Sequence, residues 1–230
     1  MPRVLFWDID GTLLLTGSAG LMALEGAARS LFGAAPDFSR IQTAGSTDRE
    51  IAAAIIRQLG HVPTAEEISA FVHAYERLLP ECLPKKTGRV MPKVREILDH
   101  VSKDPDFVCL LLTGNTAAGA RAKLSYYGLD GYFAGGAFAD GCSDRTAIAR
   151  RAAAMAGEFC PRIKAGNMFV IGDTPNDIAC GKAIGARTIA VATGLHALDE
   201  LIRHDPWWAV EKLPAPADFV AKLQREDCSG

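Results

Sequence analysis

The hydrophobic positions of this chain fall into short continuous runs, separated by stretches in which apolar residues recur at helical spacing. A run that is apolar throughout is typical of a strand buried on both faces of a parallel sheet. Strong runs lie at 4–7, 107–112, 168–171 and 188–192, and weaker ones at 132–139 and 207–210. Helical spacing covers 92–101, 117–127, 144–156, a segment ending near 184, and 217–223. This alternation predicts an α/β fold with a doubly wound, Rossmann-like parallel sheet.

The first two strong runs, 4–7 and 107–112, lie much farther apart than a single crossover requires. The intervening chain has helical spacing at 21–32, 49–59 and 65–79, and no strand-like alternation. We therefore predict an inserted helical cap at residues 16–88, with residues 1–15 and 89–230 forming the core domain that contains the sheet.

Composition narrows the classes of protein that the chain could belong to. Of its 230 residues 49% are hydrophobic and 23% are charged, and the net charge is -2, which argues against a nucleic-acid binder. No apolar run is long enough for a signal peptide or a membrane span. The six cysteines have no Cys-x-x-Cys pairing. We expect a cytoplasmic protein that acts on neither nucleic acid nor membranes.

The first candidate chemistry follows the run 4–7. Asp8 and Asp10 are two residues apart, so both side chains project to the same side of an extended backbone, and Gly11 permits a sharp turn after them. Ligands bind at the carboxyl ends of strands in a doubly wound sheet. A strand followed by an ordinary acidic turn is the alternative that these residues alone leave open.

A second acidic pair follows the run 168–171. Asp173 lies at the predicted strand end, and Asp177 lies in the first turn of the next helix. Carboxylates gathered at one edge raise one another's pKa values, and a divalent cation removes that conflict. Oxygen ligands without His or Cys indicate Mg²⁺ rather than zinc.

A third cluster, Thr113-Gly114-Asn115, follows the run 107–112 and opens a helix. A hydroxyl together with backbone N–H groups at a helix N-terminus can bind a phosphate oxygen. For the next residue, Thr116, a plain N-cap is the interpretation that we prefer.

In this order the motifs resemble those of the haloacid dehalogenase superfamily of phosphohydrolases. The matching residues are Asp8-Ile9-Asp10-Gly11-Thr12, Leu112-Thr113-Gly114-Asn115 and Gly172-Asp173-Thr174-Pro175-Asn176-Asp177. The resemblance covers essentially the whole chain, and the inserted cap looks like that of the phosphoglycolate phosphatase and β-phosphoglucomutase branch. It implies a Mg²⁺-dependent phosphatase for a small phosphorylated metabolite, either phosphoglycolate-like or a sugar phosphate.

The resemblance also implies roles for individual residues. Asp8 would be the nucleophile that forms an aspartyl-phosphate, and Asp10 would protonate the leaving group and then activate water. Asp8, the backbone carbonyl of Asp10 and Asp173 would hold Mg²⁺, with Asp177 supporting through water. Thr113, Gly114 and Asn115 would bind the phosphate.

One departure from the family pattern concerns the lysine that normally binds phosphate between the second and last motifs. The expected region holds Asp144-Arg145, and no lysine lies between Lys123 and Lys164. We favour Arg145 for this role, because a guanidinium binds oxyanions well. Lys123 is the competitor, and we expect it to be a solvated side chain on its helix.

The stretch 45–49 is the most polar part of the cap, and a loop there could close over the site. Arg49 is a candidate for binding a substrate carboxylate or phosphate, although a solvated charge at a helix start is the interpretation that we favour. The sequence leaves open whether the protein is a monomer or a homodimer.

Four other functions are rivals to the phosphatase. A phosphomutase is the main rival among enzymes, whereas a dehalogenase has no use for an acid at Asp10. A phospho-acceptor signalling domain would also gather carboxylates and Mg²⁺, but such domains are about half this length and have no cap. The presence of Asp8, Asp10 and Asp173 argues against a catalytically silent binding protein.

Overall fold

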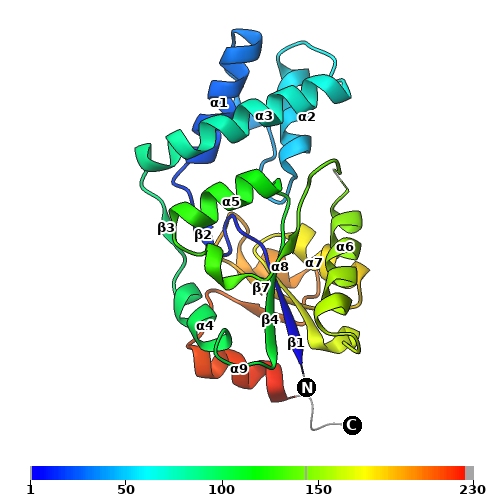
Figure 1. Cartoon of the computed structure of the whole chain (residues 1–230). Coiled ribbons are helices and arrows are strands. Elements are labelled where there is room, and N and C mark those ends of the chain that lie inside the picture. Colours follow the sequence, from blue (N-terminus) through cyan, green and yellow to red (C-terminus); the bar gives the residue numbers. More distant parts are fainter. Residues whose placement is uncertain (1, 143, 226–230) are drawn as a thin grey trace.

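The computed structural model describes residues 2–142 and 144–225 and is built around a six-stranded sheet (Figure 1). Neighbouring strands run parallel in the order β5-β4-β1-β6-β7-β8. The strands are β1 (Arg3–Trp7), β4 (Phe107–Leu112), β5 (Gly136–Ala137), β6 (Met168–Gly172), β7 (Arg187–Val191) and β8 (Trp208–Val210). The predicted doubly wound α/β fold is confirmed, and β1 lies between β4 and β6.

Helices cover both faces of this sheet, which explains why its strands are largely apolar. In β1, Val4 and Phe6 pack into one apolar cluster, whereas Leu5 and Trp7 pack into another on the opposite face. The first cluster includes α6 (Arg145–Phe159) and α7 (Pro175–Ala183), and the second includes α4 (Val94–Val101) and α9 (Pro216–Gln224). Figure 1 places these two pairs of helices on opposite sides of the sheet.

Residues 16–88, which we call the cap, contribute three α-helices that pack on one another in an apolar cluster of their own. These helices are α1 (Ala19–Phe32), α2 (Asp48–Gln58) and α3 (Ala65–Cys82). Thr47 and Thr64 begin α2 and α3 with capping boxes, within two residues of the starts of the helical spacing at 49–59 and 65–79. The cap stacks on α5 (Ala117–Tyr126), which α3 contacts (Figure 1).

A short antiparallel ribbon forms where the chain passes between core and cap. It pairs β2 (Leu14–Leu15) with β3 (Arg89–Val90). The predicted borders of the cap, after residue 15 and before residue 89, fall at this ribbon. Two residues per strand carry too little periodicity for the sequence to reveal them.

The strand expected at 132–139 is much shorter than the sequence suggested. Only Gly136–Ala137 pairs with β4, and a 3₁₀ helix, Asp130–Tyr132, occupies the start of the run. The aromatic side chains of Tyr132, Phe133 and Phe138 still pack against the core, so the apolar run reflects burial without regular pairing. The sequence also missed α8 (Leu198–Ile202), whose five residues are too few for a clear helical period.

Three further features of the fold are the possible membrane spans, the cysteines and two neighbouring tryptophans. Within the described part of the chain, no helix is long and apolar enough to cross a membrane. The five cysteines in that part are free, and Cys228 lies outside it. Trp207 and Trp208, which begin the weak apolar run 207–210, pack against the core.

Candidate active site

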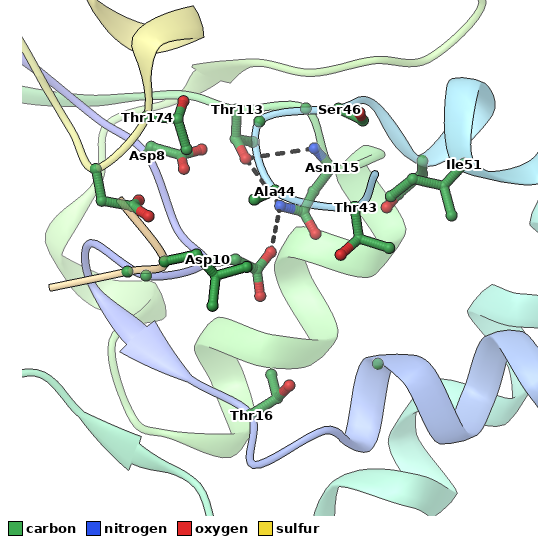
Figure 2. Close-up of a pocket in the computed structure, with 18 of the residues that line it drawn as sticks. Asp8, Asp10, Thr16, Thr43, Ala44, Ser46, Ile51, Thr113, Asn115 and Thr174 are labelled. Carbon is green, nitrogen blue, oxygen red and sulfur yellow. Dashed lines mark hydrogen bonds between the residues drawn. The ribbon is translucent and has the colours of Figure 1, made fainter. Parts of the chain in front are cut away.

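The carboxyl ends of β1, β4 and β6 bring the three motifs together at one edge of the sheet. Because these strands are neighbours, the residues that follow them, Asp8, Thr113 and Asp173, meet there. They line a pocket of about 300 Å³ between the sheet edge and the cap (Figure 2). The pocket wall includes most of the predicted site residues: Asp8, Asp10, Thr113, Gly114, Asn115, Arg145 and Asp173.

A cluster of three buried carboxylates forms the deep part of this site. Asp8, Asp173 and Asp177 each offer an oxygen, and these atoms lie within 4.8 Å of one another. Burial and repulsion from Asp177 raise the pKa of Asp8 to about 7 and the pKa of Asp173 to about 8. A hard divalent cation matches this donor set, because its ligands would all be oxygen atoms and its charge would offset the repulsion.

The backbone around Asp173 is shaped to receive its carboxylate. Gly11 has a φ of +85°, and a Cβ atom at Gly11 or at Gly194 would overlap the Asp173 side chain. The Thr12 hydroxyl donates a hydrogen bond of 2.8 Å to Asp173 Oδ1. The carboxylate is therefore held in place by the loops that follow β1 and β7, as an oriented metal ligand requires.

Asp10 lies on the other side of the pocket, and 46% of its side chain is exposed. Its Oδ2 accepts hydrogen bonds from Asn115 Nδ2 at 2.9 Å and from Lys123 Nζ at 2.5 Å. Asn115 Nδ2 also donates to Thr113 Oγ1 at 2.8 Å, so the second motif is linked directly to Asp10 (Figure 2). The carboxylate remains open to the pocket while its position is fixed.

The expectation that Lys123 is solvated is wrong. Its side chain is only 5% exposed, and Nζ contacts Asn115 Oδ1 at 2.6 Å as well as Asp10. The phenol of Tyr75 in α3 is a further hydrogen-bond partner. Burial alone would lower the pKa of Lys123, but the nearby charges, led by Asp10, outweigh it and raise that pKa. The lysine faces inward because the cap packs against α5.

Arg145 lies at the acidic end of the pocket, as the sequence suggested. Its guanidinium forms an ion pair with Asp177, and it is close enough to Asp8 to lower that residue's pKa. Burial would lower the pKa of Arg145 itself, but Asp177 and Asp8 raise it. Within the described residues its buried Nε has no hydrogen-bond partner, so the guanidinium keeps a donor for a phosphate oxygen.

The two cations that the sequence offered as alternatives thus occupy different ends of one pocket. Arg145 lies beside Asp8 and Asp177, and Lys123 pairs with Asp10. Asp177 is also held by Thr174, whose hydroxyl donates to Oδ2 at 2.6 Å. Because both of its oxygens are engaged, Asp177 is suited to support a cation through water rather than to bind it directly.

Gly114 joins the cap to the core. Its carbonyl accepts a 2.8 Å hydrogen bond from the Asp48 N–H, and Asp48 Oδ2 accepts a 2.8 Å bond from the Thr116 N–H. A Cβ atom at Gly114 would press against Ser46 and Arg145. The Thr116 hydroxyl accepts from the Gly119 N–H, so its predicted role as an N-cap is confirmed.

Asp48 and Tyr75 are pocket residues that the sequence did not single out for the site. Burial raises the pKa of Asp48 to about 6, against the opposing charge of Lys123. In the sequence, Asp48 looks like any acidic residue in the first turn of a helix, and Tyr75 looks like a core aromatic. Only the packing of the cap on α5 distinguishes them.

Arg49 lies outside the pocket wall. Its guanidinium is 3.4 Å from the Ser69 hydroxyl in α3, to which it donates a hydrogen bond within the cap. The substrate-binding role considered for Arg49 therefore has no support from its position. Successive helical residues point about 100° apart, so the burial of Asp48 at the core contact leaves Arg49 on another face of α2.

Models of known protein families match the part of the chain that contains these site residues. The model of the haloacid dehalogenase-like hydrolases matches residues 5–182, and a related HAD-hydrolase-like model matches residues 145–222. The first match spans the first, second and last motifs together with the cap. No match was found among curated proteins.

Solved structures show the same fold at low sequence identity. A predicted phosphoglycolate phosphatase from Haemophilus somnus is 17% identical, with a TM-score of 0.74, and the match covers 97% of this chain and 98% of that one. A candidate β-phosphoglucomutase from Bacteroides vulgatus is 21% identical, with a TM-score of 0.71 and coverage of 97% and 89%. CbbY from Rhodobacter sphaeroides, solved with phosphate, is 16% identical, with a TM-score of 0.72 and coverage of 92% and 95%. From its motifs, its fold and the extent of the family match, the chain belongs to the haloacid dehalogenase-like hydrolases.

Proposed function

We propose that this protein is a Mg²⁺-dependent phosphatase that hydrolyses a small phosphorylated metabolite through an aspartyl-phosphate on Asp8. The observation that carries the proposal is the position of Asp8 in the pocket wall, within an oxygen-only cluster and beside Arg145. Asp10 stands two residues away with its carboxylate open to the same pocket. A nucleophile, an acid–base group and an anion-binding cation therefore face one space.

The first step transfers the phosphoryl group to the protein. One carboxylate oxygen of Asp8 forms a bond to phosphorus while the bond from phosphorus to the substrate oxygen breaks. Asp10 gives its proton to that oxygen, so that a neutral alcohol leaves. The Thr113 hydroxyl, which hydrogen-bonds to Asp8, and the Arg145 guanidinium hold the reacting groups in place.

The second step regenerates Asp8. A water molecule attacks phosphorus, Asp10 accepts a proton from that water, and inorganic phosphate leaves with the oxygen of the water. Asp8 returns to its carboxylate form. Asp10 thus acts as acid and then as base, which suits a side chain that reaches the pocket while Asn115 and Lys123 hold its position.

The residues at the sheet edge fit the expected metal. Asp8, Asp173 and the backbone carbonyl of Asp10 would hold Mg²⁺, with Asp177 supporting through water. Bound there, Mg²⁺ supplies positive charge that lets an anionic phosphate approach an anionic nucleophile. Burial, and then repulsion from Asp177, raise the pKa values of Asp8 and Asp173, and a cation at this cluster would offset that repulsion.

Release of inorganic phosphate from p-nitrophenyl phosphate and a panel of metabolite phosphomonoesters tests this proposal. We expect turnover with Mg²⁺ and its loss with chelator, restored when Mg²⁺ is added back. Turnover that is unchanged in chelator would contradict the Mg²⁺ requirement. Hydrolysis of none of the phosphomonoesters would contradict the phosphatase assignment. The cytoplasmic location and the oligomeric state stay predictions.

A further inference from the structure

We propose that the substrate's leaving group is an uncharged alcohol with aliphatic surface, and that it carries neither a carboxylate nor a second phosphate. This inference rests on the proposed phosphatase function and narrows its substrate class. The part of the pocket that would hold the leaving group lies between Asp10 and the cap, because the phosphoryl group must reach Asp8 at the sheet edge.

The charged side chains on the pocket wall are mostly negative. In the described part of the chain, the charged side chains that line the pocket are two cations and four carboxylates: Lys123, Arg145, Asp8, Asp10, Asp48 and Asp173. Both cations come from the core. The single charged residue that the cap contributes to this wall is Asp48, which would repel a second anion.

Neither cation is available to the leaving group. The guanidinium of Arg145 lies at the acidic end, paired with Asp177, where the phosphoryl group itself needs it. The ammonium of Lys123 has three donors, and Asp10, Asn115 and Tyr75 each make a hydrogen bond with it. A second anionic group on the substrate would have to displace one of these partners or lose hydration without gaining a cationic partner, and either change is costly.

The surface that the cap does offer is aliphatic, with hydroxyl groups between. Leu21 and Leu24 come from α1 and Ile51 from α2, and Leu15 of β2 extends the same wall. Thr16 and Thr43 add hydroxyls that can hydrogen-bond to an alcohol or an ether without requiring charge (Figure 2). A neutral alcohol of a few carbon atoms matches this lining, because its apolar part gains from burial against the leucines.

A matched pair of substrates tests the inference directly. n-Propyl phosphate and the phosphate ester of 3-hydroxypropanoate have the same number of carbon atoms, and only the second carries a carboxylate. For the wild-type protein with Mg²⁺, we expect kcat/KM to be at least about tenfold higher for n-propyl phosphate. p-Nitrophenyl phosphate, measured in parallel, reports whether the phosphatase chemistry works.

The outcomes separate this inference from the function on which it rests. Hydrolysis of p-nitrophenyl phosphate together with equal or greater kcat/KM for the carboxylate ester overturns the inference and leaves the phosphatase assignment standing. Hydrolysis of none of the three esters overturns both. Because the comparison uses the wild-type protein, it does not depend on any variant folding.

A charge introduced into the cap should reverse the preference. Leu21 is half-buried on the pocket wall, so Leu21→Arg adds a cation there, and Leu21→Gln is the matched neutral control. We expect Leu21→Arg to raise kcat/KM for the carboxylate ester, relative to n-propyl phosphate, by at least about tenfold over Leu21→Gln. Circular dichroism checks that both variants are folded. Folded variants with the same substrate ratio would contradict the proposed electrostatic cause.

Discussion

Two groups of charged side chains lie in or directly behind the pocket wall, and they differ in how completely their charges are balanced. At the sheet edge, Asp8, Asp173 and Asp177 face one another with Arg145 as their cation. Under the cap, Lys123 is paired with Asp10 and hydrogen-bonded by neutral neighbours. The first group carries excess negative charge in a buried space, whereas the ammonium of the second has all of its donors engaged.

This difference assigns the two groups different tasks. In the unbalanced group, burial and mutual repulsion raise the pKa values of Asp8 and Asp173, so this group can accept a cation and a phosphoryl group. The balanced group has little capacity left, so it suits positioning: it fixes Asp10 and, through Tyr75, connects Asp10 to the cap.

The largest effect should come from Asp8→Asn. The substitution is nearly isosteric but removes the nucleophile, so we expect kcat to fall by at least about 10⁴-fold. Thermal unfolding should show a folded protein, because one of three mutually repelling carboxylates becomes neutral. A folded variant whose kcat was still about 10⁻² of the wild-type value, or higher, would show that Asp8 is not the nucleophile.

Asp10→Asn should lower kcat by about 10²–10⁴-fold, the usual range for losing a general acid and base. Mg²⁺ affinity should largely survive, since Asp10 is expected to contribute its backbone carbonyl to the metal. The loss should be smaller for p-nitrophenyl phosphate than for an alkyl phosphate, because nitrophenolate leaves without needing a proton. Equal losses for both substrates would exclude the acid role.

Lys123→Met removes the cation of the balanced group while keeping most of the side chain's volume. We expect kcat to fall by about 10–10²-fold, because Asp10 loses the contact that fixes its position. The loss should follow the same dependence on leaving group as Asp10→Asn, and the two substitutions together should cost little more than Asp10→Asn alone. Fully additive losses would mean that Lys123 acts independently of Asp10.

Without metal, the unbalanced group should make stability depend on pH. Folding raises the pKa of Asp8 and Asp173 from 3.8 to about 7 and about 8, so their protonated forms favour the folded state. That contribution is complete below about pH 4 and is lost as the pH rises through 7 and 8. In chelator, Tm should therefore fall less steeply with rising pH for Asp8→Asn than for wild type, and Mg²⁺ should stabilise the wild type more at about pH 8 than at about pH 5. Identical pH slopes for the two proteins would contradict the assignment.

The smallest effect should come from Arg49→Ala. Because Arg49 contacts Ser69 within the cap and does not line the pocket, kcat/KM should change by less than about twofold. A large rise in KM with an unchanged fold would return Arg49 to the substrate site.

The sequence could predict the residues at the sheet edge because their positions follow from local rules. Apolar runs fix where parallel strands end, and the ends of neighbouring strands meet, so Asp8, Thr113 and Asp173 come together without knowledge of side-chain packing. Arg145 came instead from the family resemblance, which calls for a phosphate-binding cation in that region, and this residue begins α6.

The group under the cap could not be predicted in this way. Lys123 lies inside a helix, and its burial depends on which face of α5 meets α3, a tertiary contact that is invisible in the spacing of either helix. Asp48 and Tyr75 reach the pocket from helices distant in the sequence. The predicted length of β5 was wrong for a related reason, because apolar residues can be buried without pairing in a sheet.

The central claim, a phosphoryl group carried on Asp8, is tested most directly by trapping it. Wild-type protein mixed with Mg²⁺ and its best substrate, then quenched in acid during turnover, should gain the mass of one phosphoryl group on the peptide that contains Asp8. Asp8→Asn treated in the same way should gain none. A wild-type protein that turns over without ever carrying phosphate, or that carries it on another residue, would contradict the mechanism.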